Sequence, residues 1–457
     1  MEALSVKDLL QATNGNLISG NELDEINNIA IDSRKAKLGD VFIAIIGENL
    51  DGHKFMQSAL DNGCKTFIKN RSNSIKFESS DINLIEVDDT TIALGDIAKY
   101  YKEKFVIPYI GVTGSVGKTT TKDMIYAAIS NNFDTLKNEG NFNNHIGVPL
   151  TLFNLNKKHE CAIIEMGMSN FNEIEYLANI VNPKIGVISN IGLSHIENLG
   201  SQDGILKAKL EITTNFDENN ILIVNGDDEY LSKVCKEDCN YNLKTFGFNS
   251  NNDVYCTEYI MSEDSINFKC IIDGKEEAIF IPTVGKHNIY NAMAAILVGL
   301  ILGMELEDIK LGLRGFTASK MRLDIFKKDD LTIINDAYNA SPDSMKAALD
   351  ILGRYEKRRV AILGDMFEMG EHSEYGHRLV GESSINNVDV LITVGDMSKF
   401  IGYEAKKLGL DSNNIYHFKT KELAIESLDS LINKDDAVLV KASRGMKLEE
   451  IVEYLSK

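Results

Sequence analysis

The sequence contains no tryptophan and no apolar run long enough to cross a membrane. Its N-terminus, MEALSVKDLLQATNGN, mixes acidic, amide and glycine residues and lacks the apolar core of a signal peptide. With 44% hydrophobic and 25% charged residues, the composition is that of an ordinary globular protein and excludes a disordered chain. We therefore expect a folded protein of the cytoplasm with no membrane partner.

Cysteine patterns typical of disulfide frameworks or zinc sites are also missing. None of the six cysteines forms a C-x-x-C pair. Cys235 and Cys239 are four residues apart, but no second pair or histidine cluster completes a zinc site. Scattered, partly buried thiols in a reducing compartment are the interpretation that we adopt.

Positive charge is scarce, since 48 Lys and Arg face 68 Asp and Glu, for a net charge of −20. The field of such a chain repels nucleic acid and anionic membrane surfaces, so we expect neither as a partner. An anionic substrate would have to be held in a local positive pocket.

The 457 residues suggest about three domains at ~150 residues each. Short apolar runs of the strand type alternate with helical patterns along the whole chain. We expect strands at 40–46, 65–69, 106–111, 161–164, 185–188, 221–224, 331–334, 360–363, 390–394 and 437–441. Helices are expected at 55–62, 91–105, from Lys118 onward and at 288–304, with a β-rich stretch at 246–282.

That alternation is typical of parallel sheets with helices on both faces. There is no internal repeat and no low-complexity linker. We predict an α/β fold with three domains, at residues 1–104, 105–320 and 321–457.

The most informative stretch is IGVTGSVGKTT at residues 110–120, which follows an expected strand and precedes an expected helix. Glycines let backbone N–H groups turn toward phosphate oxygens, and a helix N-terminus adds positive potential. Lys118 would reach the β- and γ-phosphates and Thr119 would hold Mg²⁺. The strict G-x-x-x-x-G-K-[ST] motif fails by one position, because Val112 stands where its first glycine belongs. ATP or GTP binding is nevertheless indicated.

Other nucleotide motifs are missing. The absent G-x-G-x-x-G removes the main support for a nicotinamide or flavin cofactor. A guanine-reading N-K-x-D is absent too, because the nearest string, Asn156-Lys-Lys-His159, lacks the aspartate. Glu165 directly follows an apolar strand and is the obvious carboxylate for the metal. A switch, a motor, a kinase and a ligase all remain open at this point.

Further strings follow one another in a recognisable order. They are IDSR (31–34), GDVFIA (39–44), GNFNNHIGVP (140–149), EMG (165–167), NIGLSH (190–195), KAKLE (207–211), GKHNIYNAMAA (285–295), NDAYNASP (335–342) and LGDMFEMG (363–370). Together with the phosphate loop, they resemble the Mur ligase family, the ATP-dependent amide-forming enzymes of peptidoglycan precursor synthesis. The resemblance extends over nearly the whole chain.

The resemblance implies a three-domain architecture: a UDP-sugar-binding domain, a central P-loop domain and a Rossmann-like C-terminal domain. DAYNASPDSM and LGDMFEMG look most like the family members that add D-alanyl-D-alanine to UDP-N-acetylmuramoyl-tripeptide. The string D-N-P-[RA], associated with relatives that add the third residue, is missing. The implied partners are therefore that nucleotide-linked tripeptide, the dipeptide and ATP with Mg²⁺, and we expect a monomer.

In the family reaction, the tripeptide carboxylate attacks the γ-phosphate of ATP, and the dipeptide amine then attacks the resulting acyl phosphate. The implied catalytic residues are Lys118, Glu165, His195, Lys209 and Arg322. The implied metal ligands are Thr119, Glu165, His195 and, if it is carbamylated, Lys209. Both Lys207 and Lys209 could instead be ordinary helix-surface lysines, and the match to A-K-x-x-[IL] favours Lys209.

The remaining site residues also follow from the resemblance. For ATP they are Gly114, Ser115, Gly117, Lys118, Thr119, Thr120, Asn291 at the adenine, Arg322 at the γ-phosphate and Asp336 at the ribose. Ser33 and Arg34 are expected at the UDP-sugar, and Tyr338 and Asn339 at the dipeptide. The segment around Arg322, TASKMRLD, lacks a glycine that is usual in the family.

Two rival functions stay open. One is another amide ligase of the same fold, either a different Mur-type enzyme or a folylpolyglutamate-type enzyme. The N-terminal domain with Asp-Ser-Arg favours a UDP-sugar over folate. The other is a P-loop protein that binds nucleotide as a switch or scaffold without ligation.

Overall fold

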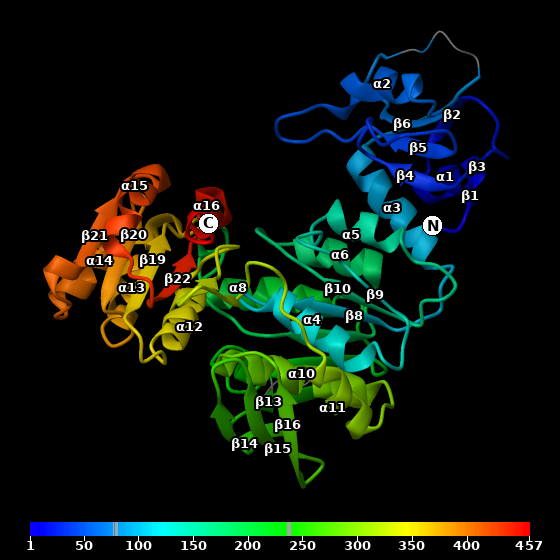
Figure 1. Cartoon of the computed structure of the whole chain (residues 1–457). Coiled ribbons are helices and arrows are strands. Elements are labelled where there is room, and N and C mark those ends of the chain that lie inside the picture. The colour runs from blue at the N-terminus through cyan, green and yellow to red at the C-terminus, as the bar shows by residue number, and fades with distance from the viewer. Residues whose placement is uncertain (76, 78–80, 235–238) are drawn as a thin grey trace.

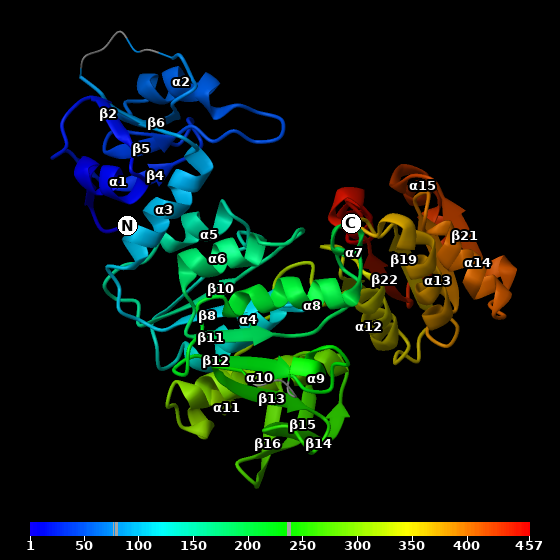
Figure 2. The same ribbon diagram turned by 180° about the vertical axis from the view of Figure 1, so that it is seen from behind.

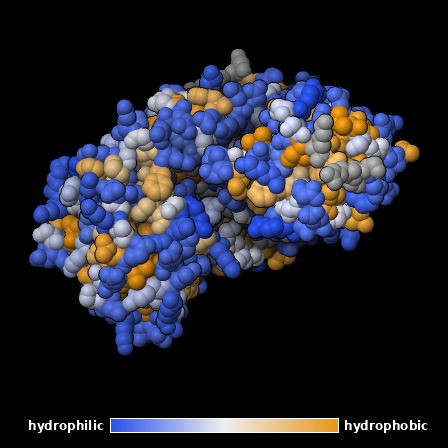
Figure 3. All heavy atoms as spheres, turned by 90° about the horizontal axis from the view of Figure 1, so that it is seen from above, coloured by the Kyte–Doolittle hydropathy of each residue, from blue (hydrophilic) through white to orange (hydrophobic). Residues whose placement is uncertain are grey.

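The computed structural model describes residues 1–75, 77, 81–234 and 239–457. Three α/β domains follow one another, and the first and third lie at opposite ends of the central one (Figures 1 and 2). Hydrophilic residues dominate the face seen from above, with apolar residues scattered among them (Figure 3). Within the described ranges, no helix is long and apolar enough to cross a membrane.

The first domain is a five-stranded sheet in the order β2-β7-β6-β5-β4, parallel except for the β2–β7 pair. Its strands are β2 (Asn16–Ser19), β4 (Asn28–Ala30), β5 (Asp40–Ile43), β6 (Thr66–Asn70) and β7 (Asn83–Val87). Helix α3 (Thr90–Lys102) begins where Asp89 accepts hydrogen bonds from the N–H groups of Thr91 and Ile92. It packs on α5 (Gly147–Leu152) and α6 (Glu173–Val181), and so joins the first domain to the second.

The central sheet has nine strands in the order β16-β15-β14-β13-β12-β11-β8-β10-β9. The six strands β8 to β13 are parallel, whereas β14 to β16 form an antiparallel extension that corresponds to the predicted β-rich stretch. Their bounds are β8 (Tyr109–Thr113), β9 (Thr135–Lys137), β10 (Cys161–Glu165), β11 (Ile185–Ile188), β12 (Ile221–Asn225), β13 (Asn242–Gly247), β14 (Val254–Met261), β15 (Ile266–Ile272) and β16 (Lys275–Ile281).

Helices cover both faces of this sheet, as predicted. Neighbouring residues of each buried strand belong to two hydrophobic cores, one on each face of the sheet. Ile163, for example, packs with α4 (Lys118–Ile129), α10 (Lys286–Ile301) and α11 (Leu306–Arg314). Ile164, its neighbour, packs with α3, α5, α6 and α8 (Gln202–Leu210). Strands buried on both faces read as continuous apolar runs, which is why they were predictable.

The third domain is a six-stranded sheet in the order β17-β18-β22-β19-β20-β21, with β17 antiparallel at one edge. Its strands are β17 (Asp324–Lys328), β18 (Leu331–Asn335), β19 (Arg359–Gly364), β20 (Val390–Val394), β21 (Ile415–Phe418) and β22 (Ala437–Lys441). One face is covered by α12 (Pro342–Leu352), α13 (Ser373–Ser384) and α14 (Lys399–Lys407). The other is covered by α15 (Lys421–Leu431) and α16 (Glu449–Leu455).

Each of the ten predicted strands corresponds to a strand within a few residues. The strands that were not predicted include β2, β4, β7, β9, β13, β17 and β21. The side chains of β17 and β21 are mostly half-exposed and therefore form no continuous apolar run. The helix expected from residue 288 begins earlier, at Lys286.

The prediction of free thiols is confirmed for the five described cysteines. Burial raises the pKa of Cys64 and Cys256 to about 11 and that of Cys161 and Cys270 to about 12. These thiols are therefore poor nucleophiles at neutral pH. Cys239 is half-buried, and Cys235 lies outside the described residues.

Candidate active site

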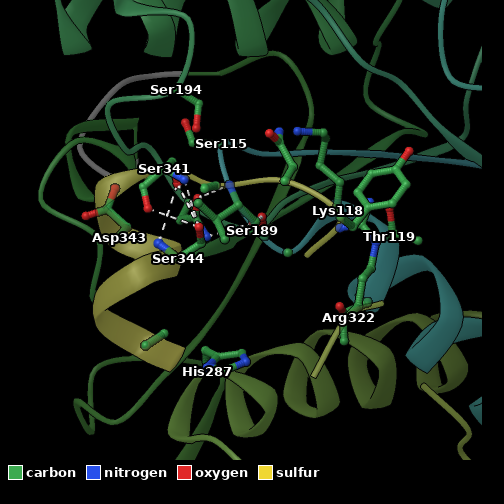
Figure 4. A pocket seen from close by; sticks show the side chains of 18 of the residues that line it. Ser115, Lys118, Thr119, Ser189, Ser194, His287, Arg322, Ser341, Asp343 and Ser344 are labelled. Atoms are coloured by element: carbon green, nitrogen blue, oxygen red, sulfur yellow. Dashed lines mark hydrogen bonds between the residues drawn. The ribbon is translucent and has the colours of Figure 1, made fainter. Parts of the chain in front are cut away.

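A cavity of about 580 Å³ opens at the carboxyl ends of β8, β10 and β11, where the third domain meets the central one. Ligands of open α/β sheets bind outside the carboxyl ends of the strands. In Figure 4 the first turn of α12, with Ser341, Asp343 and Ser344, borders one side of this cavity, and Lys118, Thr119 and Arg322 border the other. The cavity therefore brings together side chains from two domains.

The predicted phosphate loop connects β8 to α4. Gly114 packs so closely on the next strand that a Cβ there would lie 1.9 Å from the Ser189 Oγ, and no larger residue fits. The N–H groups of Ser115 and Val116 donate to Asn190, at 3.0 Å to its carbonyl and 2.9 Å to its Oδ1. The loop is thus held in shape by the end of β11. Within this loop and the start of α4, five predicted residues line the cavity: Ser115, Gly117, Lys118, Thr119 and Thr120.

Lys118 is half-buried at the floor of this cavity and donates to the Gly114 carbonyl at 2.8 Å. Burial lowers the pKa of Lys118, the carboxylate of Glu165 opposes that shift, and the nearby Arg322 adds to it. Lys118 and Arg322, which belong to different domains, are therefore close enough to repel each other, and an anion bound between them would relieve that repulsion.

Glu165, the last residue of β10, is 2% exposed. Thr119 Oγ1 donates to its Oε2 at 2.8 Å, and Asn143 Nδ2 donates to its Oε1 at 2.8 Å. The two predicted metal ligands Thr119 and Glu165 are therefore in direct contact. Hard oxygen donors of this kind suit Mg²⁺, which keeps several waters and needs few protein ligands. Among the described residues, no three His, Cys, Asp or Glu side chains cluster as a metal cage.

His195 lines the same cavity, in the loop after β11, and has a left-handed φ of 64°. Its Nδ1 lies 2.7 Å from the Glu368 carboxylate of the third domain. This contact lowers the pKa of Glu368. The described partner of His195 is thus a carboxylate across the domain boundary.

The two candidate lysines of α8 differ sharply in their surroundings. Lys209 is 1% exposed, and it forms no ion pair within the described part of the chain. Burial, reinforced by Lys118, holds the pKa of Lys209 well below its usual range. Lys207 is exposed, with its Nζ 5.9 Å from the Phe171 ring centroid. Only Lys209 therefore has an environment that favours the neutral amine.

The third domain contributes four predicted residues to the cavity: Arg322, Asp336, Tyr338 and Asn339. The Arg322 guanidinium lies 4.2 Å from the Tyr338 ring centroid, a cation–π geometry. Left-handed φ values of 59° at Met321 and 50° at Leu323 flank Arg322. The turn therefore forms without the glycine that is usual in the family.

Asp336 and Asn339 are both held by Lys441, the last residue of β22. Lys441 Nζ forms a buried ion pair with Asp336 and donates to the Asn339 carbonyl at 2.9 Å. The same aspartate accepts from the N–H of Leu323 at 3.1 Å. Lys441 thereby fixes the two residues relative to the turn that contains Arg322.

Asn291, from α10, is 5% exposed and lies against the phosphate loop. Its Oδ1 accepts from Thr121 Oγ1 at 3.0 Å, and its Nδ2 donates to Asn288 at 2.9 Å. His287, one turn earlier, also lines the cavity, and burial lowers its pKa to about 4. That imidazole is neutral at pH 7.

Ser33 and Arg34 lie in the first domain and are not among the described residues that line the cavity. The Arg34 side chain is 85% exposed and forms two bonds with Asp32, of 2.9 and 2.8 Å. Ser33 is buried, and its carbonyl accepts from Asn62 at 2.9 Å. The structure therefore keeps these two residues apart from the residues predicted to bind ATP.

Sequence reasoning missed several cavity residues. Asn143 and Glu368 lie inside strings that were recognised but were not singled out there. Lys441 ends a predicted parallel strand, and that position could have identified it. Asp343, on α12, has its pKa raised by burial and lies against the central domain, where a Cβ on Gly192 would be 2.3 Å from its Oδ2.

Comparison with known proteins gives a consistent result for every part of the chain. Residues 25–102 match the model "Mur ligase family, catalytic domain", residues 112–299 match "Mur ligase middle domain", and residues 321–444 match "Mur ligase, glutamate ligase domain". The chain is 40% identical to the UDP-N-acetylmuramoyl-tripeptide–D-alanyl-D-alanine ligase of Bacillus subtilis, over 99% of this chain and 98% of that relative.

Solved structures agree with the sequence comparison. A crystal structure of MurF from Acinetobacter baumannii is similar with a TM-score of 0.92 and 32% identity over 100% of both chains. MurF ligase from Thermotoga maritima in complex with ADP is similar with a TM-score of 0.83 and 27% identity over 94% of this chain and 97% of that one. These matches confirm the predicted three-domain α/β architecture.

Proposed function

This chain belongs to the Mur ligase family, and from that premise we propose that it adds D-alanyl-D-alanine to UDP-N-acetylmuramoyl-tripeptide at the expense of ATP. The reaction is a step of peptidoglycan precursor synthesis, and the chain is a ligase that forms ADP and phosphate. The observation that supports it best is the cavity in which the phosphate loop, the buried Glu165 and cations from the third domain converge. We infer that the enzyme acts in the cytoplasm.

The chemistry requires two anions to meet. A carboxylate oxygen of the tripeptide bonds to the γ-phosphorus while the bond to the β–γ bridging oxygen breaks, which gives an acyl phosphate and ADP. The dipeptide amine then bonds to the acyl carbon, loses a proton and expels phosphate. Preorganised cations reduce the electrostatic cost of the first step. Lys118 and Arg322 would stabilise the transferring group from opposite domains.

The nucleotide would lie along the phosphate loop. Asn291 lines the cavity beside Gly117, and the family resemblance assigns it to adenine. Asp336 would contact the ribose, with Lys441 holding it in place. The N–H groups of the loop, together with Ser115 and Thr120, would surround the phosphates.

The residues present fit Mg²⁺. Thr119 and Glu165 would hold it, because their oxygens already meet at the edge of the cavity. When bound, Mg²⁺ would neutralise phosphate charge. We assign His195 and a carbamylated Lys209 as further ligands, and His195 would have to exchange Glu368 for that role.

The two remaining substrates would bind on either side of the nucleotide. Ser33 and Arg34 of the first domain would hold the UDP-sugar. Tyr338 and Asn339 line the cavity from the third domain and would receive the dipeptide. Each of the three substrates would thus be bound mainly by a different domain, and amide formation would require the three domains to close together.

Substrate dependence of phosphate release tests this proposal. We expect purified protein to release phosphate from ATP only when both UDP-N-acetylmuramoyl-tripeptide and D-alanyl-D-alanine are present. Steady hydrolysis of ATP that ignores the dipeptide would contradict the proposal and favour a nucleotide-driven switch. Activity with a folate substrate, or with a single amino acid in place of the dipeptide, would favour another ligase of this fold.

The UDP-sugar assignment predicts a selective effect of Arg34→Ala. The KM for the nucleotide-linked tripeptide should rise roughly 10- to 100-fold, because a charge-assisted hydrogen bond contributes ~1.5–3 kcal/mol. Because the arginine is exposed, kcat and the thermal midpoint should stay unchanged. Arg71→Ala is the matched control: Arg71 pairs with Asp88 at 3.0 Å in the same domain. Equal KM changes in the two variants would refute the assignment.

A further inference from the structure

A buried lysine lies beneath the phosphate loop and has no role in the reaction described above. Lys122 follows Lys118 by four residues on α4 and is 2% exposed. Burial of an ammonium group is costly unless it is paired and hydrogen-bonded. Its contacts therefore show what this lysine does.

Lys122 reaches Glu165 by two routes. Its Nζ lies 3.9 Å from Glu165 Oε2. It also donates at 2.7 Å to the carbonyl of Asn138. The Asn138 side chain in turn accepts from the Glu165 N–H at 2.9 Å and donates to the Glu165 carbonyl at 3.0 Å. The carboxylate and the backbone of Glu165 are thus both tied to Lys122.

The neighbouring Asp123 connects the same helix to the third domain. It is 5% exposed, its Oδ1 lies 3.7 Å from Lys122 Nζ, and it accepts from Lys137 Nζ at 2.7 Å. Its other oxygen accepts a hydrogen bond from Ser319 Oγ. Ser319 belongs to the linker between the domains, and its carbonyl accepts from the N–H of Arg322 at 3.3 Å.

We propose that Lys122 and Asp123 are positioning residues, Lys122 for the Glu165 carboxylate and Asp123, through Ser319, for the linker that contains Arg322. The first residue keeps Glu165 against Thr119. The second fixes the point from which the third domain swings over the nucleotide. The inference rests on the proposed function for the roles of Glu165 and Arg322, but the contacts themselves do not depend on it.

The first arm of the test measures Mg²⁺ dependence. Lys122→Met keeps the length of the side chain and removes its charge. We expect the Mg²⁺ concentration for half-maximal ATP binding, measured by calorimetry, to rise 10–100-fold, as is typical when a residue that orients a metal ligand is lost. Lys122→Arg should recover part of the affinity. Because nucleotide binding is measured without the other substrates, this result is independent of whether the protein ligates the dipeptide.

Lys102→Met is the matched control. Lys102 is also a buried lysine, 8% exposed, but it lies on α3 with its Nζ 4.4 Å from the Tyr109 ring centroid. A merely structural role for Lys122 would shift the thermal midpoint of both variants without changing the Mg²⁺ dependence. Folded Lys122→Met with wild-type Mg²⁺ dependence would overturn the proposal for Lys122.

The second arm substitutes Ser319, in the linker between α11 and β17, and so does not depend on whether Lys122→Met folds. Ser319→Ala should lower kcat about tenfold while ATP affinity stays unchanged, because it removes one anchor of the Arg322 turn. Ser319→Thr, which keeps the hydroxyl, should restore turnover. An unchanged kcat in Ser319→Ala, or failure of Ser319→Thr to restore a lowered one, would overturn the proposal for Asp123.

Discussion

Lys118→Ala should lower kcat/KM by about 10³-fold, an effect typical of losing one charge-stabilising donor in a phosphoryl- or acyl-transfer site. This loss corresponds to about 4 kcal/mol of transition-state stabilisation. The fold should remain intact. Burial lowers the pKa of Lys118, which means that the buried charge does not stabilise the folded state, and its described hydrogen bond is only to its own loop. Phosphate release with all three substrates, together with a thermal melt, measures both expectations.

The chain offers a close control for this variant. Lys286 is the first residue of α10 and follows Gly285, just as Lys118 is the first residue of α4 and follows Gly117. Its Nζ lies 4.4 Å from the Phe248 ring centroid, and it is not among the described residues that line the cavity around Lys118. Lys286→Ala should therefore keep near-normal turnover. A Lys118→Ala enzyme as active as this control would refute the phosphate-loop assignment.

Lys209→Ala should reduce kcat at least about 10²-fold if this lysine becomes a metal-ligating carbamate. The uncharged amine attacks the carbon of CO₂, forms an N–C bond and releases a proton, so that a cation becomes an anion. Burial and Lys118 favour the neutral amine at Lys209, and the product charge would attract Lys118 where the ammonium repels it. As the pH falls, protonation of the amine should reverse the modification.

NMR of the protein labelled with ¹³C-bicarbonate tests directly whether Lys209 carries a carbamate. The wild type should show a carbamate carbon resonance at neutral pH that is absent from Lys209→Arg. Lys207→Ala, two residues away on the exposed face of α8, should keep both the resonance and the activity. A missing resonance in an active wild-type enzyme would rule out the carbamate.

Sequence patterns alone were enough to predict the phosphate loop, the strand that ends in Glu165 and the buried strands of the two large sheets. Each of these features is local. Glycines at fixed offsets before a Gly-Lys-Thr, and apolar runs of four to six residues, can be recognised without knowing what packs against them. The edge strands β17 and β21 escaped prediction because a half-exposed strand has no such run.

Which polar groups meet depends on tertiary packing and could not be predicted from local patterns. Lys207 and Lys209 look alike in sequence, and the packing of α8 buries one and exposes the other. Lys441 pairs with Asp336 from 105 residues away, and Ser319 meets Asp123 from 196 residues away. Such pairs depend on which strands become neighbours and how the domains dock, and this information is distributed over the whole chain. Topology therefore brings Lys118, Arg322 and Lys441 together at this cavity.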